Sequence, residues 1–167
     1  MSIQIVKGNL LESDVNYICH QVNCQVKMTS GIAKSIREKW PKAYDEYINW
    51  YQEWQVKEAE LSSFEYSPSA SEMMLGEICL VNIEKNKNII HMASQEFYGY
   101  DKRRYTSYDA FWNCLHEIKQ EIPRGSKIGF PYGIGCVRGG ANWNIIYTMI
   151  KEVLAQDFEV YIYQLED

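Results

Sequence analysis

Short apolar runs alternate along this chain with longer segments in which apolar residues recur at helical spacing. The short runs predict strands at 3–7, 16–22, 78–83, 89–93, 127–130 and 159–165. The longer segments predict helices at 32–39, from Pro41 onward, at 107–121 and at 143–155. The segment 61–71 is rich in Ser and Pro and predicts a loop, and the polar segment 84–87 predicts a turn joining two strands. Strands that alternate with helices favour a single α/β domain over residues 1–167, with a largely parallel sheet covered on both faces.

Two segments, 23–34 and 130–143, share one pattern: a strand end, small residues including glycine, and then a helix. Glycine lets the backbone approach an anion, and a helix N-terminus directs its N–H groups and its dipole toward negative charge. A single loop of this kind is weak evidence, since turns and close packing also need glycine. Two of them, each at a strand-to-helix junction, predict a nucleotide-type ligand at the carboxyl ends of the strands.

Composition narrows the class of ligand. The formal net charge of −5 argues against a broad nucleic-acid surface, but it allows a small anion held by backbone dipoles. No apolar stretch approaches the ~20 residues of a membrane span, and no signal-peptide pattern opens the chain, so we expect no membrane partner. The 5 cysteines are scattered without a C-x-x-C pair, which predicts reduced thiols, a cytoplasmic location and no metal. We also expect no cofactor.

A series of motifs in a fixed order resembles the macro domain family over nearly the whole chain. The motifs are Val6–Leu11, His20-x-x-Asn23, Gly31–Ala33, Trp40–Tyr44, Leu75–Glu77, Ile90–Gln95, Tyr98-Gly99, Tyr108, Pro131–Trp143 and Val160–Leu165. The branch that it resembles includes the ADP-ribose 1″-phosphate phosphatases, with the ADP-ribosyl-glutamate hydrolases as near relatives. This resemblance implies a three-layer α/β/α fold with a central mixed, mostly parallel sheet, and ADP-ribose or a derivative as the ligand.

The resemblance also implies ligand contacts at particular positions. These are Gly8, Asn9, Leu10, Asn23, Ser30, Gly31, Ile32, Ala33, Gln95, Pro131, Gly133, Ile134, Gly135, Cys136, Val137, Arg138, Gly139, Gly140 and Leu165. Asn9 would accept a hydrogen bond from the adenine amino group, or it is only a turn residue after Gly8. The amides of Gly31–Ala33 would hold the diphosphate. Asn23 would face the distal ribose, or it is only a turn former.

Catalysis is assigned by the resemblance to His20, with Asn23 beside it. A histidine near its reference pKa of ~6.5 can act as base, acid or nucleophile toward phosphate. The alternative is a core histidine bonded to a backbone carbonyl. We expect His91, between Ile90 and Met92, to be structural, and His116 to be solvated.

Several positions depart from the family pattern. Val137 stands where relatives have glycine, and Asn142 where they have aspartate. No Lys lies between His91 and Tyr100 and no Asp between Pro131 and Trp143, so the residues of the glutamate-linked ADP-ribosyl hydrolases are missing. Two functions are therefore favoured over ADP-ribosyl hydrolysis. One is hydrolysis of ADP-ribose 1″-phosphate, and the other is non-catalytic binding of ADP-ribose, an ADP-ribosylated protein or a cyclic ADP-ribose-type signal.

The segment 98–105 is a further candidate feature, because it contains the run Lys102-Arg103-Arg104. It is interpreted either as a flap that attracts an extra phosphate or as an ordinary charged connection.

Overall fold

The computed structural model describes residues 1–63 and 65–166. Its strands are β1 (Ser2–Lys7), β2 (Tyr17–Val22), β3 (Ile78–Glu84), β4 (Lys87–Ala93), β5 (Lys127–Pro131) and β6 (Glu159–Gln164). Its helices are the 3₁₀ turn η1 (Leu10–Glu12), α1 (Gly31–Lys39), α2 (Pro41–Leu61), α3 (Ala70–Met74), α4 (Tyr108–Glu121) and α5 (Trp143–Leu154). The predicted α/β class is confirmed.

One six-stranded sheet has the order β1-β6-β5-β2-β4-β3. All neighbouring strands are parallel except β3, which pairs antiparallel with β4, so the sheet is mixed as predicted. The turn between β3 and β4 is tighter than the sequence predicts. Only Lys85 and Asn86 lie outside the two strands, and Asn86 takes the left-handed φ of 59° that such a short turn requires.

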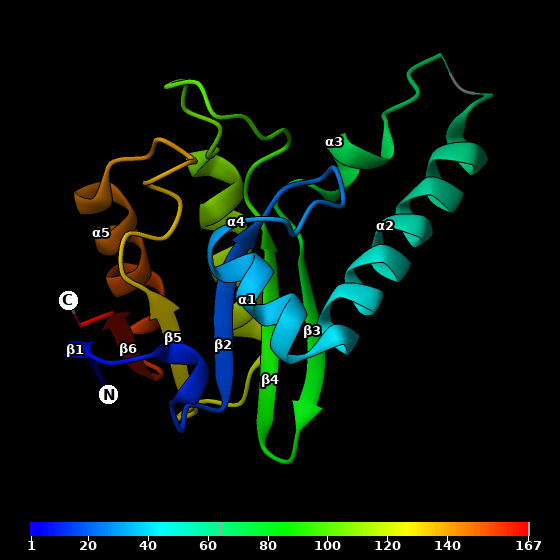
Figure 1. The fold of residues 1–167 in the computed structure, drawn as a ribbon. Coiled ribbons are helices and arrows are strands. Elements are labelled where there is room, and N and C mark those ends of the chain that lie inside the picture. The colour runs from blue at the N-terminus through cyan, green and yellow to red at the C-terminus, as the bar shows by residue number, and fades with distance from the viewer. Residues whose placement is uncertain (64, 167) are drawn as a thin grey trace.

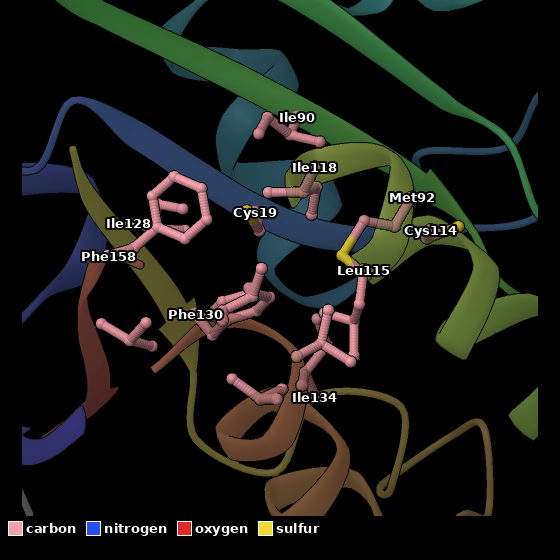
Figure 2. Close-up of a cluster of buried hydrophobic side chains, with 14 of the residues drawn as sticks. Cys19, Ile90, Met92, Cys114, Leu115, Ile118, Ile128, Phe130, Ile134 and Phe158 are labelled. Carbon is pink, nitrogen blue, oxygen red and sulfur yellow. The ribbon is translucent and has the colours of Figure 1, made fainter. Parts of the chain in front are cut away.

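Helices cover both faces of the sheet. On one face, α4 and α5 pack against the sheet through a buried cluster that includes Leu115, Ile118 and Phe130 (Figure 2). On the other face, η1, α1, α2 and α3 supply a second cluster, in which Tyr47 and Ile36 are fully buried. Burial of these apolar side chains on both faces is the main favourable contribution to folding.

The parallel strands end at a common edge of the sheet, where three loops gather (Figure 1). These loops follow β2, β4 and β5 and comprise residues 23–30, 94–107 and 132–142. We call them the first loop, the flap and the second loop. Among the described residues, no helix is long and apolar enough to cross a membrane.

Candidate functional site

A cleft with a volume of about 360 Å³ lies between the three loops. Its lining combines the end of β2, the start of α1, the flap and the second loop: Gln21, Val22, Asn23, Lys27, Thr29, Ser30, Gly31, Ile32, Ala33, Gln95, Tyr98, Gly99, Tyr100, Pro131, Tyr132, Gly133, Ile134, Gly135, Cys136, Val137, Arg138 and Gly139. The two glycine-containing segments that the sequence singles out therefore face each other across one cleft.

The N-terminus of α1 forms one wall of the cleft. The side chain of Ser30, at the N-cap position, makes no capping hydrogen bond, and the first turn contains no acidic residue. The first N–H groups of a helix have no intrahelical acceptor, so those of this turn are available to an anion. Gly31 has a left-handed φ of 58°, and a Cβ built there would meet no atom within 4 Å. This wall is open, polar and electropositive.

The second loop rests on two polar residues beneath it, Gln21 and Thr106. The Thr106 hydroxyl donates to the Gly135 carbonyl at 2.8 Å, and the Gln21 amide donates to that hydroxyl at 2.9 Å. The Thr106 N–H donates to the Gly139 carbonyl at 3.0 Å. A Cβ at Gly139 would lie 2.2 Å from the Thr106 hydroxyl oxygen, so only glycine lets the loop approach this closely.

Sequence reasoning missed both of these supporting residues. The available signal was the polar side chain of Gln21 between His20 and Val22 at the end of β2.

Asn23 lines the cleft, but its polar groups are already engaged. Its Oδ1 accepts from the backbone N–H groups of Gln25 (2.9 Å) and Lys27 (3.3 Å), and its Nδ2 donates to the Lys27 carbonyl at 3.0 Å. The buried Tyr47 hydroxyl of α2 donates to the backbone carbonyl of Asn23 and lies 3.1 Å from its Oδ1. Asn23 thus holds the shape of the first loop, and Tyr47 ties that loop to α2.

We expect Tyr47→Phe to destabilise the fold and loosen the first loop. The change leaves the buried Asn23 carbonyl without its hydroxyl donor, a loss of about 1–3 kcal/mol. Urea unfolding measures the stability, and calorimetry with ADP-ribose measures the effect on the cleft. The matched control is Tyr44→Phe on the same helix, because the Tyr44 hydroxyl makes no side-chain hydrogen bond within the described residues. Equal losses in the two variants would contradict this role of Tyr47.

His20 does not lie in the cleft, which corrects the interpretation of this residue as catalytic. It is fully buried on the face of the sheet covered by α2, and its Nε2 lies 2.8 Å from Nδ1 of His91, also fully buried. Nε2 of His91 lies 2.8 Å from the Ala43 carbonyl, which can only accept, so His91 donates from Nε2 and accepts at Nδ1. His20 must then donate from Nε2, and its buried Nδ1 has no partner among the described residues.

Burial lowers the pKa of His20 well below its usual range, with the nearby His91 as the second cause. Burial also lowers the pKa of His91 to about 4, against a smaller opposite effect of the Ala43 carbonyl. Both imidazoles are neutral at pH 7. They serve as a buried link between β2, β4 and α2, and the expectation of a structural His91 agrees with its position.

Five of the sequence-predicted ligand residues lie outside the lining of the cleft: Gly8, Asn9, Leu10, Gly140 and Leu165. Leu10 is buried in the core, whereas Leu165 is 68% exposed. The side chain of Asn9 caps η1 by accepting from the Leu11 N–H at 3.0 Å. Gly8, Asn9 and Leu165 still follow β1 and β6 at the same edge of the sheet, beside the end of the cleft formed by Pro131 and Tyr132.

The charged side chains that line the cleft are all basic. Lys27 and Arg138 belong to its lining, whereas no Asp, Glu or His of the described residues does. In the described part of the chain, no group of three or more His, Cys, Asp or Glu side chains is placed to hold a metal ion. The arrangement offers N–H groups, two cations and tyrosine rings, which suit the binding of an anionic nucleotide.

No family model matches the chain, and no curated protein matches it. Several solved structures, however, are similar to it. A protein of unknown function from Bacteroides thetaiotaomicron is similar, with 26% identity and a TM-score of 0.78 over 99% of each chain. The macrodomain of Thermus aquaticus DarG is similar over 99% of this chain and 98% of its own, with 20% identity and a TM-score of 0.67.

A third similar structure is Thermosipho africanus DarTG in complex with ADP-ribose. It matches 98% of this chain with 16% identity and a TM-score of 0.68, and this chain covers 41% of that one. These likenesses establish that the chain has the macrodomain fold.

Proposed function

We propose that this protein binds ADP-ribose, free or attached to another molecule, in the cleft between the first and second loops. The observation that carries the proposal is the open N-terminus of α1 facing the glycine-rich second loop across one cleft. A diphosphate in that position would accept from the amides of Gly31–Ala33 on one side and from those of Gly133 and Gly135 on the other, since the Ile134 and Cys136 amides already donate to carbonyls of their own loop. A structural neighbour in complex with ADP-ribose supports the same ligand.

The protein acts as a binder and not as a phosphatase in this proposal. General acid–base hydrolysis needs a titratable side chain within hydrogen-bond reach of the reacting group. His20 is buried away from the cleft, Asn23 is engaged within its own loop, and no carboxylate or imidazole of the described residues lines the cleft. The two charged residues of the lining, Lys27 and Arg138, suit the binding of negative charge.

Two measurements test the proposal together. Calorimetry should give saturable binding of ADP-ribose. AMP lacks the second phosphate and the second ribose, and it should bind at least about tenfold more weakly because one phosphate contact alone is worth more than 1 kcal/mol. Incubation with ADP-ribose 1″-phosphate should release no phosphate above the rate without protein. Release of phosphate by the wild-type protein would overturn the binder assignment, and equal affinity for AMP would overturn the placement of the diphosphate.

A further inference from the structure

Strand β3 lies at one end of the sheet, and its outer edge pairs with no other strand of residues 1–63 and 65–166 (Figure 1). In an antiparallel pair, successive residues turn their N–H and C=O groups alternately toward the partner strand and away from it. The Glu77 carbonyl accepts from the Ala93 N–H at 3.0 Å, whereas the Ile78 N–H donates away from β4, to Oε2 of Glu117 at 3.0 Å. Odd-numbered positions at the start of β3 therefore bond to β4, and even-numbered positions face outward.

This alternation turns the main-chain groups of Leu80 and Asn82 toward the open edge. Both residues are exposed, and Leu80 is 44% exposed although it is apolar. Natural edge strands are commonly protected from pairing by lysine or proline, and the segment 78–83 contains neither. A β-bulge follows Asn82, so the strand bends only toward its end. The middle of β3 can accept a further extended strand.

The first half of β3 lies among carboxylates from both sides of the sheet. On the α4 side, burial and then the neighbouring Glu77 carboxyl raise the pKa of Glu117 to about 8. On the α2 side, burial and then the charges of Glu46 and Glu53 raise the pKa of the Cys79 thiol to about 12. The ion pairs formed by the described residues include none of these four glutamates. This end of the edge carries uncompensated negative charge.

The other end of β3 is basic, because the turn into β4 carries Lys85 and is followed by Lys87. Lys87 lies opposite Glu84 in the hairpin, whereas the exposed Lys85 belongs to no ion pair of the described residues. Charge along the edge thus changes from negative to positive in the direction of the strand. Such an edge is complementary to a second copy of itself that runs antiparallel.

We propose that the protein forms a symmetric dimer in which the β3 strands of two copies pair antiparallel across a two-fold axis at Val81. Leu80 of each copy then faces Asn82 of the other, and each of these pairs exchanges both main-chain N–H···O bonds. Lys85 of each copy lies level with Glu77 of the other. The sheet continues from one copy into the next, and the hydrogen bond at the start of each β3 stays in place.

Both clefts remain open in this dimer. The two-fold axis reverses the direction of the strands, so the loops of the two copies lie at opposite edges of the joined sheet. No residue of β3 or of its turn lines the cleft. The dimer is therefore independent of the proposed ligand.

Sedimentation velocity tests the dimer. The wild-type protein should change from monomer to dimer over about a hundredfold range of concentration. Leu80→Lys should raise the dimer Kd at least about tenfold, because the axis places the new lysine in the interface twice. The matched control is Ile145→Lys on α5, since Ile145 is 43% exposed, and this variant should dimerise like the wild type. In the wild-type dimer, amide hydrogen exchange at Leu80 and Asn82 should slow as the protein concentration rises.

Charge reversal tests the direction of the pairing. Lys85→Glu should weaken the dimer, and Glu77→Lys added to it should restore the wild-type affinity, since the two positions meet across the axis. A wild-type protein that stays monomeric would leave the edge to a strand of another protein and overturn the proposal. So would a dimer that neither Leu80→Lys nor Lys85→Glu weakens, or one in which the Leu80 amide exchanges as in the monomer. ADP-ribose affinity should be the same in all variants, and its absence in the wild type would refute the proposed function alone.

Discussion

Gly31→Asp should abolish ADP-ribose binding while leaving the fold intact. Asp tolerates the left-handed backbone better than most residues, and the space beyond Gly31 is open, so the side chain fits. A carboxylate at the start of α1 also suits the helix dipole. The same carboxylate would face the diphosphate. Two unit charges about 4 Å apart repel by ~4 kcal/mol near a protein surface, which predicts a loss of affinity of at least ~100-fold.

Gly31→Asn is the matched control for this change, because it has nearly the same shape and backbone tolerance without the charge. Calorimetry should show that the Asn variant loses less than about tenfold in affinity for ADP-ribose, because it adds only the bulk of a side chain and no charge. Thermal unfolding should give Asp and Asn variants with similar melting temperatures. If the two variants bind ADP-ribose equally well, the diphosphate does not lie at α1.

The buried histidine pair should make the protein sensitive to acid. The pKa of both imidazoles is lowered by burial in the folded protein, whereas in the unfolded chain both titrate near ~6.5. As pH falls below that value, the unfolded state binds protons that the folded state does not, so stability falls. The expected loss is on the order of 2 kcal/mol per histidine at pH 5 relative to pH 8, and it is absent above about pH 7.5.

His20→Gln tests this pH dependence. The variant should lose less stability than the wild type between pH 7 and pH 5, because a glutamine side chain can still donate to His91 but does not titrate. Urea unfolding across this range measures the difference, and His116→Gln on the exposed surface of α4 is the control. In the wild-type protein, imidazole NMR signals of His20 and His91 should not titrate above about pH 5. Titration of either near its usual pKa would contradict the buried pair.

The sequence by itself determined the order of the six strands and of α1, α2, α4 and α5, and it located the two glycine-containing loops, whereas the short η1 and α3 were missed and α3 begins inside the segment 61–71 that was predicted to be a loop. Strand and helix periodicities differ strongly over these lengths, and glycine at a strand-to-helix junction has a local cause. Parallel strands then place both loops at one edge of the sheet by topology alone, which is why Gly31 and Gly135 line the same cleft.

The tertiary structure decided the direction and the partners of individual side chains. Ile18, Cys19 and His20 are all buried because helices cover both faces of β2, and such a strand has no alternation to reveal which face His20 joins. Asn23 and Tyr47 lie 24 positions apart, and Gln21 and Thr106 lie 85 apart. Those hydrogen bonds exist only because the packing of α2 and the flap brings the groups within reach, and they hold the first and second loops in place around the cleft.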